Sequence, residues 1–161
     1  MSKKQLEEAL ELQEQGKFAE SNVILNDLIS NANCYGDVYY HYASNCDSQG
    51  NEREAVGYYE KAIHEGLSSE DLQGAYLGLG STYRTLGMYK ESDKTLRKGI
   101  ESFPNDYALK VFHALTLYNL GNYEASTQLL LQCITETTND AEILRYKKAL
   151  EFYAPQLDQV W

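Results

Sequence analysis

The residues that could bind a metal ion lie in one short stretch of the sequence. Cys34, His41 and Cys46 are close together, and thiolate and imidazole are the groups that bind zinc in proteins. Their spacings match no known zinc pattern, and the three cysteines, of which Cys133 is the last, include no Cys-x-x-Cys pair. We therefore predict no metal, no cofactor and no disulfide framework. Free thiols suit a reducing compartment.

Catalytic groups show no recognisable arrangement. The sequence contains no glycine-rich phosphate-binding loop, no nucleophile motif and no histidine or carboxylate pair in a familiar setting. Glutamates at 7, 8, 11 and 14 have the spacing of a solvated helix surface. We therefore predict that the chain is not an enzyme.

Charge and hydropathy narrow the range of partners. The 161 residues include 24 acidic and 14 basic side chains, giving a net charge of −10, which repels phosphate backbones and anionic lipid surfaces. The N-terminal residues are polar and amphipathic, without the apolar core of a signal peptide. No apolar run approaches the roughly 20 residues that span a bilayer. We expect a cytoplasmic protein that binds neither nucleic acid nor membranes.

One short phrase recurs four times along the chain. The segments GKFAES, GNEREA, GMYKES and GNYEAS begin at residues 16, 50, 87 and 121, so their glycines are 34, 37 and 34 residues apart. Apolar side chains at helical spacing lie on both sides of each glycine. Because glycine tolerates the positive φ that ends a helix, each unit is predicted to be a helix, a tight turn and a second helix. The units span about 2–34, 36–69, 70–106 and 107–139.

The residues between units end one helix and begin the next. Pro104 cannot continue a helix, and Asp106 can cap the one that follows. Residues 68–71 read as a capping box at the start of the third unit. The three extra residues of the longer spacing fall there, either in a connection or as an added helical turn. Residues 139–142 begin one more helix, predicted over about 140–153, that covers the last apolar face and leaves a tail at 154–161.

These units resemble the tetratricopeptide repeat, and the resemblance covers nearly the whole chain. That family places a large residue early in the first helix, as Tyr39 and Tyr76 do here, and ends a unit with proline, as Pro104 does. Its small positions hold Ala9, Ala43, Gly80, Ala114, Ala55 and Ala62, and its aromatic position after the turn holds Phe18, Tyr89 and Tyr123. Glu52 replaces that aromatic residue in the second unit. The resemblance implies an all-α, right-handed α-solenoid of helix–turn–helix repeats, a single domain over 1–153 with a C-terminal capping helix.

The resemblance also implies a function, because such repeats usually serve as adaptors that bind another protein or peptide. The stacked first helices line a concave groove. Matching positions assign the groove to Leu6, Leu10 and Gln13 in the first repeat, Tyr40, Ser44 and Asp47 in the second, Leu77, Ser81 and Arg84 in the third, and Val111, Leu115 and Tyr118 in the fourth. Tyr40 and Tyr118 are expected to be exposed anchors.

One subtype of the family binds the C-terminal carboxylates of chaperone tails through lysine, arginine and asparagine on successive first helices. The corresponding places here hold Leu6, Leu10, His41, Gly74 and Gly78. None of these pairs with a carboxylate as an ammonium or guanidinium group would. We therefore expect a different ligand, either an extended apolar segment or an amphipathic helix.

The alternative function is self-association into a homodimer or a larger scaffold through the terminal helix or the tail. Leu157, Val160 and Trp161 could dock on the chain's own convex surface or in a neighbour's groove, although fraying is the simpler expectation for a tail. Two other features have both a structural and a functional interpretation. The basic ridge of Lys90, Lys94, Arg97 and Lys98 is a solvated face or a docking site for an acidic partner. Tyr39, Tyr42, Tyr59, Cys46, Cys133 and His113 are expected in the core.

Overall fold

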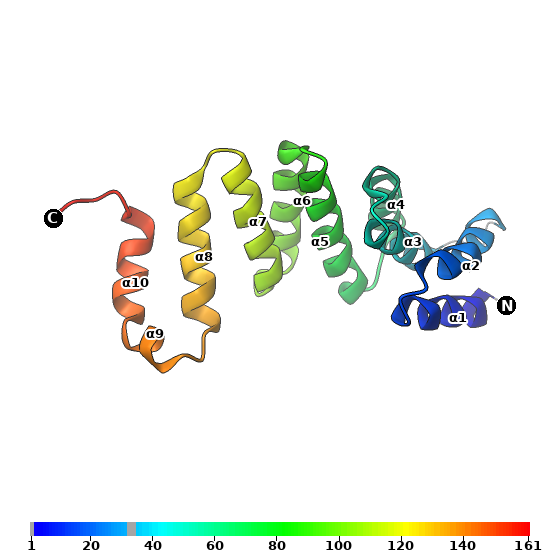
Figure 1. The fold of residues 1–161 in the computed structure, drawn as a ribbon, viewed down its shortest axis with the longest axis horizontal. Helices are drawn as coiled ribbons and strands as arrows, with labels where there is room; N and C mark the ends of the chain where they lie inside the picture. Colours follow the sequence, from blue (N-terminus) through cyan, green and yellow to red (C-terminus); the bar gives the residue numbers. More distant parts are fainter. Residues whose placement is uncertain (1, 32–34) are drawn as a thin grey trace. The chain divides into compact units, whose positions relative to one another are not determined.

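The structure, a computed structural model, describes residues 2–31 and 35–161, and every regular element in these ranges is a helix (Figure 1). The prediction of an all-α fold made of helix–turn–helix repeats is confirmed. Cys34, one of the possible metal ligands, lies outside the described residues. The chain divides into two compact units, one ending at Met88 and the other beginning at Tyr89. The single domain expected over 1–153 stays a prediction.

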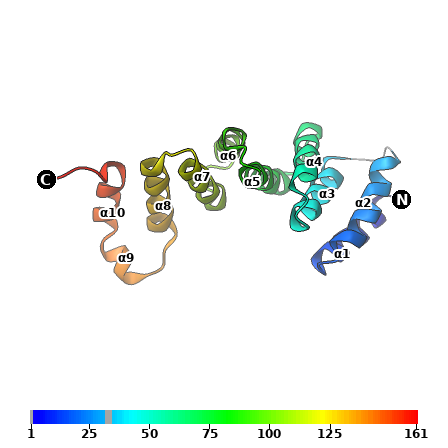
Figure 2. The ribbon, with the colours of Figure 1, turned by 45° about the horizontal axis from the view of Figure 1, so that its top comes forward.

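The first unit contains five helices: α1 (Ser2–Glu14), α2 (Phe18–Ser30), α3 (Gly36–Ser48), α4 (Glu52–Glu65) and α5 (Ser69–Thr85). Each helix packs against the next one in the chain, and the first helices of successive repeats also meet, α1 with α3 and α3 with α5 (Figure 2). The three extra residues lengthen α5, which has 17 residues where α1 and α3 have 13. The insertion therefore adds a helical turn rather than a longer connection.

The second unit contains α6 (Tyr89–Ser102), α7 (Tyr107–Asn119), α8 (Tyr123–Thr137), α9 (Ala141–Arg145), α10 (Lys147–Tyr153) and the 3₁₀ turn η1 (Ala154–Gln156). Helix α7 packs between α6 and α8, and both α10 and η1 pack against α8 (Figure 1). The unit thus consists of the second half of the third repeat, the whole fourth repeat and the terminal segment.

The terminal segment differs from the prediction of one helix over about 140–153. At Tyr146 the amide donates to the Ile143 carbonyl three residues back, and the backbone leaves the α conformation, so two short helices form. The helix was expected to cover the last apolar face, but its own apolar residues Leu144 and Tyr153 are exposed. Ala154, expected in the tail, is buried. The end of the chain is therefore anchored through η1, while much apolar surface around it stays open.

Turns and helix starts follow the predicted chemistry. The glycine after each first helix has positive φ, between 73° and 81° at Gly16, Gly50, Gly87 and Gly121. Ser68 Oγ caps α5 by accepting from the Asp71 amide at 3.2 Å, and Asp106 caps α7 through the Leu109 amide at 3.1 Å. These bonds satisfy amides that have no partner inside their own helix.

Small residues allow the two helices of a repeat to cross closely. Ala9 and Ala114 are fully buried at the crossings of the first and fourth repeats. At both crossings the second helix donates the same hydrogen bond, from Ser21 Oγ to the Ala9 carbonyl at 2.8 Å and from Ser126 Oγ to the Ala114 carbonyl at 2.7 Å. The predicted small positions therefore carry a contact that recurs in the two compact units.

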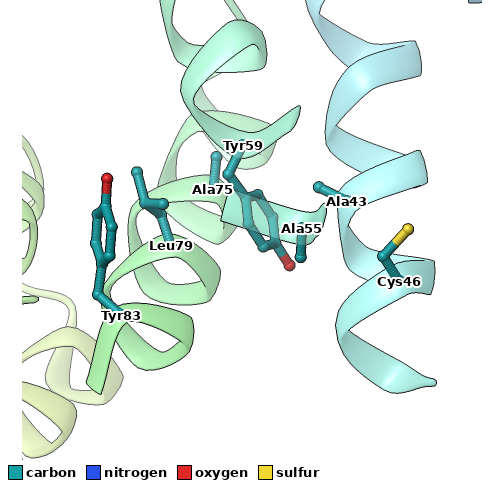
Figure 3. Close-up of a cluster of buried hydrophobic side chains, with 7 residues drawn as sticks. All are labelled: Ala43, Cys46, Ala55, Tyr59, Ala75, Leu79 and Tyr83. Carbon is teal, nitrogen blue, oxygen red and sulfur yellow. The ribbon is translucent and has the colours of Figure 1, made fainter. Parts of the chain in front are cut away.

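The largest buried cluster of the first unit joins α3, α4 and α5. It consists of Ala43, Cys46, Ala55, Tyr59, Ala75, Leu79 and Tyr83 (Figure 3). The predicted burial of Tyr59, Cys46, Cys133 and His113 is confirmed. Tyr39 and Tyr42 are only partly buried, and Tyr42 packs at the margin of the cluster.

Candidate functional site

Nine of the predicted groove residues lie on the first helices of the first unit. Spacings of four and three residues place each set on one face of its helix: Leu6, Leu10 and Gln13 on α1, Tyr40, Ser44 and Asp47 on α3, and Leu77, Ser81 and Arg84 on α5. All nine are partly exposed. Because α1 meets α3 and α3 meets α5, these sets lie on neighbouring helices. We call them the first-unit face.

A hydrogen bond connects α1 to α3 on this face. Gln13 Oε1 lies 3.0 Å from His41 Nδ1. Burial lowers the pKa of His41, although the carboxylates of Asp71 and Asp37 act in the opposite direction. The imidazole is therefore neutral at neutral pH, and the charge near this link is the negative charge of the two carboxylates.

Two glycines of α5 accommodate tyrosine hydroxyls at its contact with α3 and α4. A Cβ atom at Gly78 would lie 2.5 Å from Tyr59 Oη, and a Cβ atom at Gly74 would overlap Tyr40 Oη. Tyr40 was expected to be exposed, but its ring packs against the core cluster and lies 6.2 Å from the Tyr59 ring. Burial, followed by the charges of Asp71 and Glu70, raises the pKa of Tyr40. Tyr40 thus supports the face from within as well as lining it.

Polar contacts hold α3 against its neighbours. Ser44 lies near the Tyr59 hydroxyl, and Asp47 lies near the buried Thr82, whose hydroxyl donates to the Gly78 carbonyl at 2.7 Å. Burial raises the pKa of Asp47, the nearby Thr82 opposes this shift, and the charge of Glu52 adds to it. Ser44 and Asp47 therefore fix the arrangement of the first-unit face while staying partly exposed.

The remaining predicted residues lie on α7 in the second unit. Val111 and Leu115 are partly exposed, and Tyr118 is 61% exposed, as expected. The Tyr118 ring lies 5.0 Å from the Tyr123 ring at the start of α8. These three residues form an open, mainly apolar surface on α7.

Another face of α7 lines a pocket that the sequence analysis did not predict. The pocket has a volume of about 370 Å³ and is formed by α6, α7 and α8. Ile100, Leu117, Ala125 and Leu129 contribute its apolar wall, and Arg97, Glu101, Lys110, His113, Gln128 and Gln132 contribute polar groups. We call it the α6–α7–α8 pocket. The sequence analysis named two of its lining residues, Arg97 as part of the basic ridge and His113 as a core residue.

A polar network that joins the buried His113 to the exposed Arg97 forms part of the pocket wall. His113 Nε2 lies 2.7 Å from Asp93 Oδ1, and Arg97 Nε lies 3.0 Å from both carboxylate oxygens. Burial alone would raise the pKa of Asp93, but the hydrogen bonds with His113 and Arg97 outweigh it and keep that pKa below its ordinary value. Lys110 Nζ, farther along the wall, lies 3.8 Å from Glu136.

Within the described ranges, 2–31 and 35–161, no group of three or more His, Cys, Asp or Glu side chains is placed to hold a metal ion. No helix of the same ranges is long and apolar enough to cross a membrane. The ridge residues Lys90, Lys94, Arg97 and Lys98 are all exposed on α6.

Three solved structures share this fold at low sequence identity. A crystal structure of YrrB, described as a TPR protein with an unusual peptide-binding site, matches with a TM-score of 0.73 and 16% identity over 87% of this chain and 71% of that one. The APC/C hetero-tetramer Cut9-Hcn1 matches with a TM-score of 0.76 and 16% identity over 96% and 30% of the two chains. The C-terminal part of a TPR repeat-containing protein from Cytophaga hutchinsonii matches with a TM-score of 0.73 and 15% identity over 92% and 57%.

Comparison of the sequence with known proteins and family models identifies the family of the chain. Among curated proteins, no sequence matches this chain. The family model described as Tetratrico peptide repeat matches residues 36–157, which is more than half of the chain. This range includes the second, third and fourth predicted repeats, whose glycine turns and helix caps the structure contains. The chain belongs to the tetratricopeptide repeat family.

Proposed function

We propose that this chain is a protein-interaction module that binds a peptide or a helix of a partner protein on its first helices. The observation that carries the proposal is the first-unit face. Nine partly exposed side chains on three contacting helices are held in place by hydrogen bonds and by the tyrosine contacts of α5. A rigid face of this kind binds with little loss of conformational entropy.

The composition of the face suggests the chemistry of its ligand. Leu6, Leu10 and Leu77 provide apolar surface. Carboxylates lie near the two rings of α3, with Asp71 acting on both Tyr40 and His41, Glu70 on Tyr40 and Asp37 on His41. The best fit is a segment with apolar side chains at helical or extended spacing and a lysine or arginine next to them. The peptide-binding site named for YrrB supports the proposal by showing that this fold can carry such a site.

The test uses a random peptide display library and two matched sets of variants. One set, Leu77→Ala and Tyr118→Ala, changes first-helix residues in each unit. The control set, Val23→Ala on α2 and Tyr146→Ala in the terminal segment, removes apolar side chains that are 71% and 58% exposed and lie outside the first helices. Tyr40 is left unchanged, because its truncation would also disturb the core.

Selected peptides should bind the wild-type chain and the control set with equal Kd values by fluorescence polarisation. Leu77→Ala should raise the Kd of peptides that bind on the first-unit face by about tenfold, which corresponds to a loss of about 1.4 kcal/mol in binding free energy. Far-UV circular dichroism should show unchanged helicity in all variants. Equal Kd values in the two sets would show that the first helices are not the binding surface.

A second candidate function is self-association, and the exposed apolar residues of the terminal segment favour it. Tyr146, Phe152, Tyr153 and Leu157 are each at least 41% exposed, and Val160 and Trp161 are more so. Exposed apolar side chains gathered in one segment of this kind often mark a protein–protein contact. Sedimentation of the wild-type chain over a range of concentrations tests this function, which fails if the mass stays that of one chain.

A further inference from the structure

We propose that residues 157–161 of one copy insert into the α6–α7–α8 pocket of a second copy. The inference rests on the second candidate function, self-association, and names the two surfaces that would meet. It does not involve the first-unit face, so peptide binding there and self-association can be tested separately.

The segment that would insert is apolar, exposed and anchored at its start. Val160 is 86% exposed and Trp161 is 76% exposed, with one contact from the Trp161 ring to the Phe152 ring at 5.3 Å. Ala154 is buried just before the segment, so five residues extend from a fixed point and can reach about 17 Å when extended. Burial of Trp161 in a partner would remove a large apolar surface from water.

The pocket fits the side chains of this segment in size and chemistry. Its volume of about 370 Å³ lies within the range of roughly 300–1,000 Å³ found for ligand pockets. Leu117 and Leu129 provide an apolar wall for the indole, and Arg97 can stack on an aromatic face. The Gln128 amide oxygen can accept the indole N–H, a donor that is usually paired when it is buried.

Charge favours the same pair of surfaces. Residues 157–161 contain Asp158 and no lysine or arginine, whereas Glu151 is paired with Lys147 at 3.7 Å. The pocket contains Arg97 and Lys110, and the three lysines of the ridge are exposed on α6, the helix that carries Arg97. Glu101 also lines the pocket, and Asp93 and Glu136 offset part of the positive charge. On a chain of net charge −10, this ridge is nevertheless the surface toward which an acidic segment is drawn.

The resulting contact joins two different surfaces of the chain. A contact of this kind is head-to-tail, and it produces open chains of copies unless the rotation between copies closes a ring. The average mass in solution should therefore rise with protein concentration. If the copies do not close into a ring, this mass should exceed that of two copies.

Sedimentation velocity with two complementary variants tests the inference. Trp161→Ala removes the inserted side chain, and Ala125→Trp fills the pocket from a partly exposed position on α8. Val23→Ala and Ala19→Trp are the matched controls, since Val23 and Ala19 are exposed on α2 and neither lines the pocket. Equal helicity by circular dichroism establishes that each variant is folded.

Each of the two test variants should associate at least about tenfold more weakly than the wild-type chain, while the controls associate normally. An equimolar mixture of the two test variants should form a particle of two chains and nothing larger, because one variant keeps the working tail and the other keeps the working pocket. If either test variant associates as strongly as the wild type, the joint is elsewhere and the inference is wrong. If both variants fail to associate and their mixture also stays at the mass of one chain, the tail does not insert into the pocket, and the inference is again wrong. A wild type that never exceeds the mass of one chain would remove self-association as well.

Discussion

The close contact between Gly78 and Tyr59 makes the sharpest prediction for stability. A Cβ atom at position 78 would meet three Tyr59 atoms, Oη at 2.5 Å, Cζ at 2.6 Å and Cε1 at 2.9 Å. Tyr59 is 3% exposed in the main cluster, so its ring has little space into which it can move. We therefore expect Gly78→Ala to destabilise the chain, although alanine is the better helix former.

The expected magnitude follows from two opposing effects. Replacing glycine by alanine inside a helix gains about 1 kcal/mol, whereas overpacking a core costs about 1–3 kcal/mol. Because three atoms clash and the ring is buried, we expect the upper part of that cost and a net loss of about 1–2 kcal/mol. Gly57→Ala in α4 is the matched control, since a Cβ atom there meets nothing within 4 Å. It should stabilise the chain by about 0.5–1 kcal/mol.

Urea unfolding followed by circular dichroism measures both changes as shifts of the midpoint in opposite directions. Adding Tyr59→Phe to Gly78→Ala removes the Oη clash and should make the double variant more stable than the sum of the single changes predicts. The Cζ contact remains, so the rescue should be partial. If Gly78→Ala stabilises as much as Gly57→Ala, the close packing of α4 on α5 is not as described.

Three further predictions concern the buried and capping groups. In a Cys34→Ser variant, Cys46 and Cys133 should react slowly with a thiol reagent until urea unfolds the chain. Both thiols are buried, and burial raises the pKa of Cys46 to about 11. Fast reaction in the native state would contradict their burial. The pKa of Asp93 is lower in the folded than in the unfolded chain, so the stabilisation by its carboxylate is present above about pH 4 and declines as the pH falls further. When the urea midpoint of unfolding is measured against pH, Asp93→Asn should therefore lose less stability below about pH 4 than the wild type does. An equal loss in both proteins would refute this. Asp106→Ala should lower the unfolding free energy by about 1 kcal/mol, because it removes the cap of α7; an unchanged urea midpoint would show that the cap contributes little.

Local signals in the sequence predicted most of the fold. The recurring glycines marked the turns because positive φ is a property of the residue itself, and the capping residues Ser68 and Asp106 act on amides three positions away. The position of the three-residue insertion could also be predicted from local sequence, since an added turn at the start of α5 leaves the following repeat in register. Burial of Cys46 and His113 followed from their positions in the repeat.

Features formed by several helices could not be predicted in this way. The α6–α7–α8 pocket needs side chains between residues 97 and 132 to converge, and each of them has an ordinary helical position when taken alone. The partial burial of Tyr40 depends on the missing side chain of Gly74, one repeat away. The interruption at Tyr146 falls in the segment after the fourth unit, where no repeat pattern exists to guide the prediction.

The glycines of α5 also connect the core to the choice of ligand. The subtype that binds chaperone tails carries long polar side chains at the places of Gly74 and Gly78, but here Tyr40 and Tyr59 extend their hydroxyls to those two positions. A lysine or arginine there would have to displace a ring that packs in the core. We therefore predict that this packing leaves no room for a carboxylate clamp on the first-unit face. Building a clamp there would require simultaneous changes in α3, α4 and α5, because the positions that it would use pack against side chains of the core.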